Sequence, residues 1–209
     1  MKHEWKKSEK DLYLPNEVPA IITVPKQKYF AIKGKGNPNG EDFAERTGVL
    51  YSLAYAVRMM PKSGFTPQGY FEYTVYPLEG VWENTDVSDK DSYKYTIMIR
   101  QPDFVDHSVV EKAFENVKRK KPHLLLSEAY FCEIEDGLSV QMLHIGDYDD
   151  ETLSFAKMHK FMENNELCRG TDFHREIYLS DPGKTERDKL KTVLRYSVKR
   201  KDKELMDEK

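Results

Sequence analysis

The residues best suited to chemistry in this chain lie on one predicted strand near its carboxyl end. Segment 172–180, DFHREIYLS, is rich in the aromatic and β-branched side chains typical of strands. Because side chains alternate along a strand, His174, Glu176 and Tyr178 share one face. A carboxylate on such a face can attract a cationic ligand or act as a general base, while a phenol donates a hydrogen bond to developing negative charge. The alternative is a surface carboxylate paired with a nearby cation, Arg175, Arg195 or Lys191.

Aromatic residues from other segments could line a ligand site around this carboxylate. Trp82 lies in the predicted loop 78–91, and loops supply many binding residues. Tyr51 and Tyr55 lie one turn apart on a predicted helix, where they either form a ligand wall or pack on the sheet. Stacking and cation–π attraction contribute about 0.5–2 kcal/mol per good contact with a planar or cationic ligand.

Other chemistries lack the residue spacing that they need. The histidines at 123, 144, 159 and 174 form no helical i, i+4 pair and no Cys/His metal pattern. Cys132 has no evident base among its strand neighbours, and two cysteines make no disulfide framework. The glycine-rich segment GKGNPNG lacks the lysine–serine ending of a phosphate loop. We therefore expect no metal and no cofactor.

Periodicity predicts the elements that position these residues. Strands are expected at 29–33, 69–77, 93–101, 172–180 and 189–198, with a hairpin over 127–146 that turns at Asp136-Gly137. Helices are expected from Glu41 to Met59, from Ser108 to Lys121 with a Ser108–Glu111 capping box, and from about Glu151 to Asn164. The basic run 118–121 complements the dipole of a helix end and carries no recognition information.

The order of elements repeats between the two halves of the chain. Aligning strand 69–77 with strand 172–180 pairs the face of Glu72, Thr74 and Tyr76 with that of Glu176. The predicted fold class is therefore α+β, with duplicated β-α-β-β units related by a pseudo-twofold axis, antiparallel sheets around a central cleft, and helices outside. Ligand sites favour such junctions.

The expected domain organisation is one body with two extensions. Residues 1–27, spaced by prolines, are expected to form an extended arm, and residues 199–209 a charged tail. The domain covers 28–198, with half one at about 28–102, a linking helix at about 106–121, and half two at about 124–198.

Composition excludes several classes of partner. The 33 basic and 36 acidic residues give a net charge of −3, so no global positive field attracts nucleic acid. No apolar run has the length of a membrane helix, and the first residues lack a signal-peptide core. We expect a cytoplasmic protein, a monomer or weak homodimer, that binds a planar aromatic small molecule and contacts neither nucleic acid nor membrane.

Three segments resemble a known family. FHREIYLSDPGKTERDKLKTVLRYSV, YFEYTVYPLEGVWE and LSVQMLHIGDYDDE resemble the stand-alone branch of the GyrI-like effector-binding proteins. The resemblance implies a duplicated fold whose cleft takes bulky planar, often cationic, drugs. Some stand-alone relatives are hydrolases that open the cyclopropane ring of DNA-alkylating compounds of the duocarmycin and yatakemycin type.

The resemblance also implies roles for individual residues. The catalytic pair is expected to be Glu176 and Tyr178. Of the residues expected to bind ligand, Trp82 and Tyr130 match the cleft aromatics of the family. Together with the residues chosen from the strand and helix patterns, the full expected set is Trp82, Tyr51, Tyr55, Tyr76, Tyr130, Met142 and His174. Two functions remain open, hydrolytic detoxification of cyclopropane-bearing alkylators and a non-catalytic module that sequesters drugs or senses effectors without its own DNA-binding domain.

Overall fold

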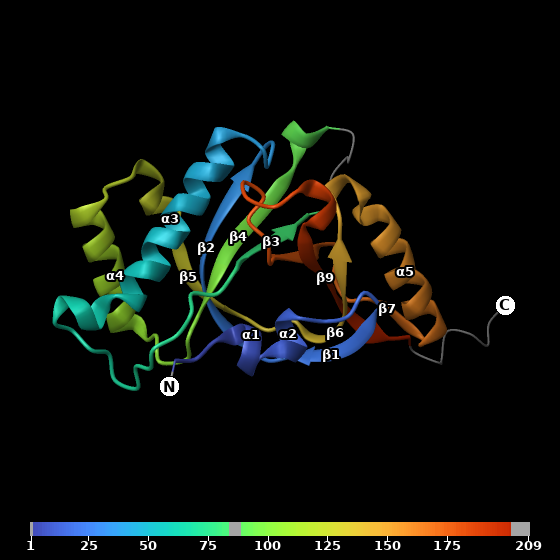
Figure 1. The fold of residues 1–209 in the computed structure, drawn as a ribbon, viewed down its shortest axis with the longest axis horizontal. Coiled ribbons are helices and arrows are strands. Elements are labelled where there is room, and N and C mark those ends of the chain that lie inside the picture. Colours follow the sequence, from blue (N-terminus) through green and yellow to red (C-terminus); the bar gives the residue numbers. More distant parts are fainter. Residues whose placement is uncertain (1, 84–88, 202–209) are drawn as a thin grey trace.

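The computed structural model describes residues 2–83 and 89–201, which form a single antiparallel sheet with helices packed on it (Figure 1). The helices are α1 Trp5–Ser8, α2 Lys10–Tyr13, α3 Glu41–Arg58, α4 His107–Lys120 and α5 Glu151–Asn164. The strands are β1 Ala20–Val24, β2 Gln27–Lys35, β3 Leu78–Trp82, β4 Lys94–Gln101, β5 Tyr130–Ile134, β6 Gly137–Ile145, β7 Leu167–Arg169, β8 His174–Tyr178 and β9 Lys191–Arg200.

The sheet is built from two equivalent units that meet at its centre. Its strand order is β1-β6-β9-β8-β3-β4-β2-β5, and β7 pairs with β9. Outward from the central β3–β8 pair, β3-β4-β2-β5 on one side mirrors β8-β9-β6-β1 on the other. The units β2-α3-β3-β4 and β6-α5-β8-β9 are therefore related by a pseudo-twofold axis, which confirms the predicted α+β class and duplication.

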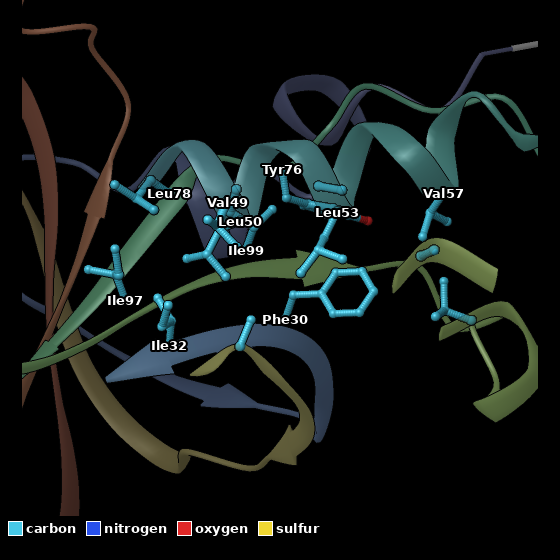
Figure 2. Close-up of a cluster of buried hydrophobic side chains, with 14 of the residues drawn as sticks. Phe30, Ile32, Val49, Leu50, Leu53, Val57, Tyr76, Leu78, Ile97 and Ile99 are labelled. Atoms are coloured by element: carbon cyan, nitrogen blue, oxygen red, sulfur yellow. The ribbon is translucent and has the colours of Figure 1, made fainter. Parts of the chain in front are cut away.

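Helix α3 packs its apolar side on the first unit. It begins after Gly40 with the acidic Glu41 and Asp42, and Pro61 follows its end, as the sequence predicted. Figure 2 shows Leu50 and Leu53 on the side of the helix that faces Phe30 and Ile99 of the sheet. All four side chains are fully buried, so this face of the first unit is closed by α3.

Helix α5 covers the second unit with a smaller core. Met158 and Met162 of the helix pack on Val140, Met142 and Leu194 of β6 and β9. In Figure 1, α3 and α5 lie toward opposite ends of the sheet, and β3 lies between them. The central strands are consequently the part of this face that neither helix closes alone.

The opposite face of the central strands carries a buried ion pair that ties the units together. Arg175 of β8 donates to Glu79 of β3 at 2.9 Å and to Asp136 at 2.8 Å. Arg175 is 4% exposed and Glu79 is 1% exposed. Removing Arg175 would leave Glu79 without an ion-pair partner in the interior.

The predicted strand 69–77 is wrong. Apart from one bridge between Tyr73 and His3, this segment has no strand structure, and the true counterpart of β8 is β3. The alternating aromatic residues serve another purpose, because Tyr73 and Tyr76 are buried against Tyr13 and the amino-terminal segment. The alignment based on strand 69–77 is therefore wrong as well, and Trp82 lies in a strand instead of a loop.

Two predictions of local structure also need correction at the edges of the sheet. Residues 1–27 are not an extended arm, since they contain α1, α2 and β1, and β1 pairs with β6. Segment 127–146 is not a hairpin, because β5 pairs with β2 while β6 pairs with β1 and β9. The turn signal at Asp136-Gly137 marks a change of strand partner.

The cap of α4 differs from the predicted capping box by two residues. Asp106 is the N-cap, and its carboxylate accepts a hydrogen bond from the Val109 backbone N–H at 3.0 Å. Of the predicted loop 78–91 and tail 199–209, residues 84–88 and 202–209 lie outside the described residues. Within the ranges that the structure covers, no helix combines the length and apolar character of a membrane span.

Candidate functional site

The strand register places Glu176 on the face of the sheet that carries the helices. Glu176 lies opposite Gly80 of β3 on one side and Leu194 of β9 on the other. Residues paired in this way point to the same face of a sheet. Phe43 of α3 stacks on Trp82, and Phe155 of α5 contacts His174, so side chains from both helices reach this central region. The site thus lies between α3 and α5, over the junction of the two units.

A chain of hydrogen bonds fixes the carboxylate of Glu176. The ring Nε2 of His174 lies 2.8 Å from Glu176 Oε1, and the Tyr178 hydroxyl donates to Oε2 at 2.8 Å. Trp82 Nε1 in turn donates to the Tyr178 hydroxyl oxygen at 2.9 Å. Glu176 is 7% exposed. The structure therefore brings together four predicted site residues, Trp82, His174, Glu176 and Tyr178. The alternative that pairs Glu176 with Arg175, Arg195 or Lys191 is wrong, because none of these cations forms an ion pair with it.

Gly80 makes this arrangement sterically possible. A β-carbon at this position would lie 2.8 Å from Trp82 Nε1 and 2.9 Å from the Tyr178 hydroxyl oxygen. Real side chains essentially never come so close, so the indole and the phenol meet only because residue 80 has no side chain.

Glu151 is a functional candidate that the sequence did not reveal. It lies on the first turn of α5, is 7% exposed, and contacts Glu176 closely enough for a hydrogen bond between the two carboxyl groups. Burial and the neighbouring charge of Glu176 raise the pKa of Glu151 well above its ordinary value. An acidic residue at a helix start is common because it complements the dipole, so nothing in the sequence marked Glu151 as unusual.

The phenols of the site remain protonated far above neutral pH. Burial, together with the charge of Glu176, raises the pKa of Tyr178 well above its ordinary value. Burial and the charges of Glu176 and Glu151 raise the pKa of Tyr148 to about 12. The Tyr148 ring meets the Tyr178 ring edge to face at 5.9 Å. Both hydroxyls can therefore act as hydrogen-bond donors.

Aromatic rings extend from both ends of the carboxylate cluster. Around Trp82, the ring centroids of Tyr95 and Phe43 lie at 5.3 Å and 6.2 Å, and the Phe43 ring is stacked. Around His174, those of Phe155 and Tyr196 lie at 4.9 Å and 6.3 Å. The carboxylates thus lie in surroundings dominated by π faces, the composition that binds flat or cationic aromatic molecules.

Three other predicted ligand residues lie on the same side of the sheet but outside this cluster. Tyr51 is half-buried beside the backbone of Leu78, and Tyr55 is 53% exposed with its ring 6.4 Å from that of Tyr51. Met142 lies two strands from Glu176, in the core under α5. It lines a separate cavity of about 300 Å³ between β6 and α5.

Two predicted ligand residues do not lie near Glu176. The strand register places Tyr130 in line with Ala31, Met98 and Glu79, which is the opposite face of the sheet. Tyr76 donates to Glu9 at 2.7 Å and lies beside the amino-terminal helices. The expectation that Glu72, Thr74 and Tyr76 face Glu176 is therefore wrong, because they do not belong to β3.

The histidine and cysteine side chains outside this cluster lie as follows. No group of three His, Cys, Asp or Glu side chains in the covered ranges is arranged to hold a metal ion. Cys132 and Cys168 are free thiols. His144 is held by Ser154 at 2.9 Å and by the Asp147 carbonyl oxygen at 3.0 Å, which fixes the loop before α5.

This chain belongs to the GyrI-like small molecule binding domain family, whose model it matches over residues 18–198. A hydrolase encoded by lin2189 of Listeria innocua is similar at 37% identity and a TM-score of 0.90, with 95% of this chain and 100% of that chain covered. An uncharacterized conserved protein of Listeria innocua is similar at 38% identity and a TM-score of 0.89, over 94% of this chain and 100% of that one. No protein of curated function matches the chain.

The fold itself recurs in a more distant protein. The C-terminal domain of EcmrR has a TM-score of 0.54 at 14% identity, and the match covers 87% of this chain and 97% of that domain. Family membership makes this chain a member of a class built to bind small molecules.

Proposed function

We propose that the protein binds bulky planar hydrophobic or cationic molecules at the Glu176 cluster and detoxifies cyclopropane-bearing DNA-alkylating compounds by hydrolytic ring opening. The observation that carries the proposal is the buried Trp82–Tyr178–Glu176–His174 chain between two aromatic walls. Supporting it are the small-molecule-binding family and the similarity to a Listeria hydrolase.

Ligand binding follows from the composition of the site. Rings from β3, β8 and α5 offer stacking surfaces, each worth about 0.5–1.5 kcal/mol for an aromatic partner. The charge of Glu176 favours a cationic or polarised ligand over a neutral one. The cluster is closed, since Trp82 and Glu176 are each 7% exposed, so a ligand enters by displacing side chains.

The same groups supply a balanced route for ring opening. Glu176 accepts a proton from water while the water oxygen bonds to the cyclopropane methylene, and the breaking ring bond sends its electron pair through the dienone to the carbonyl oxygen. Tyr178 gives its proton to that oxygen and recovers one from Glu176 along their 2.8 Å hydrogen bond. The products are a phenol and a primary alcohol, and both side chains return to their starting states.

Product analysis tests this proposal directly. The protein is incubated with a duocarmycin-type compound in ordinary water and in ¹⁸O-labelled water, and the compound is examined by mass spectrometry. Hydrolysis predicts a ring-opened water adduct that carries the label. A compound that binds but is recovered unchanged would remove the enzymatic step and leave the second candidate function, a non-catalytic module that sequesters drugs or senses an effector.

A further inference from the structure

A second carboxyl group, that of Glu151, lies against Glu176 in the interior. Glu151 comes from the first turn of α5 and Glu176 from the middle of β8, so two elements of the second unit bring the pair together. Both residues are 7% exposed. Two carboxylates in hydrogen-bonding contact and away from water repel each other too strongly for both to be ionised.

No fixed positive charge compensates the pair. Among the residues that the structure describes, Glu176 forms its single ion pair with His174, and Glu151 forms none with a lysine or arginine. The guanidinium of Arg169 lies over the Tyr196 ring at 4.4 Å. Other titratable groups that act on the pair or its neighbours include Asp147, Tyr148, Asp149, Tyr178, Asp181 and Tyr196. Asp147 and Asp149 are themselves paired with Arg187 and Lys90.

The hydrogen bonds assign the proton to Glu151. Both oxygens of Glu176 already have partners, His174 and Tyr178, which stabilise a carboxylate. Oε1 of Glu151 is buried and has no hydrogen-bond partner among the described residues. A buried oxygen without a donor suits a neutral carboxylic acid far better than an anion. The proton of the pair is therefore assigned to Glu151.

We propose that a planar aromatic cation at this site takes the place of the proton held between Glu151 and Glu176, so that cation binding releases that proton to solvent. This inference rests on the proposed binding function and adds proton exchange to it. A cation supplies the positive charge that the pair lacks, and both carboxylates can then ionise. A neutral ligand supplies no charge, so it leaves the proton in place.

The consequence is a pH dependence that separates cations from neutral ligands. While the pair holds its proton, the affinity for a cation rises by about tenfold per pH unit, because one proton leaves for each cation bound. The affinity for a neutral ligand of the same shape stays constant. N-methylacridinium, whose charge does not depend on pH, and acridine in its neutral form are suitable probes.

Isothermal titration calorimetry measures the proton directly. Titrations with N-methylacridinium are run at one pH in buffers of different ionisation enthalpy, and the dependence of the observed heat on the buffer gives the number of protons released. The wild-type protein should release about one proton, and Glu151→Gln, whose amide still donates to Glu176, should bind the cation without release. Glu163→Gln changes an exposed glutamate of the same helix and should behave as the wild type.

Each other outcome contradicts a stated part of the account. Cation binding without proton release in the wild type overturns the exchange. Unchanged release in Glu151→Gln overturns the assignment of the proton to Glu151. If acridine binds and the cation does not, the inference fails while the proposed binding function stands; if neither binds, both fail.

A second measurement needs no variant. Infrared difference spectra of the wild type should show the carbonyl stretch of a protonated carboxyl group at neutral pH, and this band should disappear when the cation binds. A band that persists in the complex would overturn the exchange.

Discussion

Replacing Gly80 by alanine perturbs the candidate site by the addition of one methyl group. The new carbon would lie 2.8 Å from Trp82 Nε1 and 2.9 Å from the Tyr178 hydroxyl oxygen. Both atoms belong to side chains that are held by hydrogen bonds of 2.9 Å and 2.8 Å, so the indole and the phenol must move apart.

The expected loss of stability follows from these contacts. Overpacking of a closed site costs about 1–3 kcal/mol, and loss of the Trp82–Tyr178 hydrogen bond adds about 0.5–1.5 kcal/mol. Replacing a strand glycine recovers about 0.5–1 kcal/mol of backbone entropy. Gly80→Ala should therefore lower the free energy of unfolding by about 0.5–4 kcal/mol, measured by urea denaturation, and should change the tryptophan fluorescence.

Gly48→Ala is the matched control. Gly48 lies in α3, where an added β-carbon meets no atom within 4 Å. This variant should gain about 0.5–1 kcal/mol from helix propensity, with tryptophan fluorescence unchanged. If Gly80→Ala were as stable as the wild type and kept its fluorescence, the described contact between Trp82 and Tyr178 would be incorrect.

Three further changes test the electrostatics and the caps. Because the pKa of Glu151 is raised above its ordinary value of 4.5, the folded protein keeps a proton that the unfolded chain loses, so the stability of the wild type falls as pH rises. The stability of Glu151→Gln relative to wild type should therefore increase by about 1.4 kcal/mol per pH unit above about 5, until Glu151 ionises. Equal pH profiles of the two proteins in urea denaturation would contradict this. Arg175→Met leaves Glu79 without its buried partner and should cost about 3–5 kcal/mol in the same assay, while a loss below about 1 kcal/mol would show that the pair is not isolated from water. Asp106→Ala removes the bond to Val109 N–H and should lower the melting temperature through a loss of about 0.5–2 kcal/mol, whereas an unchanged melting temperature would exclude this cap.

Elements defined by their own residues could be predicted from the sequence. The periodicity of α3 and its limits at Glu41 and Pro61 are local signals, and alternation along β8 placed His174, Glu176 and Tyr178 on one face. The duplication also followed from the order of elements. These predictions succeeded because helix periodicity and strand alternation depend on neighbours in the chain.

Features that depend on distant partners could not be predicted. Segment 69–77 has the composition of a strand, yet its tyrosines are buried by the amino-terminal helices. Asp136-Gly137 is a turn signal, but the strands on either side of it do not pair with each other. β5 pairs with β2, whereas β6 pairs with β1 and β9. Glu151 of α5 comes to lie beside Glu176 of β8 only in the folded chain. Nonlocal pairing of this kind leaves no periodic trace in the chain.

The proposed ring opening is tested most directly by its dependence on the charge of Glu176. Ring-opened product from a duocarmycin-type compound is measured by mass spectrometry for the wild type, for Glu176→Gln, and for Glu163→Gln as the surface control. Glu176→Gln is expected to bind a neutral ligand but to form no product, while Glu163→Gln should form product at the wild-type rate. Product formation by Glu176→Gln at the wild-type rate would contradict this expectation.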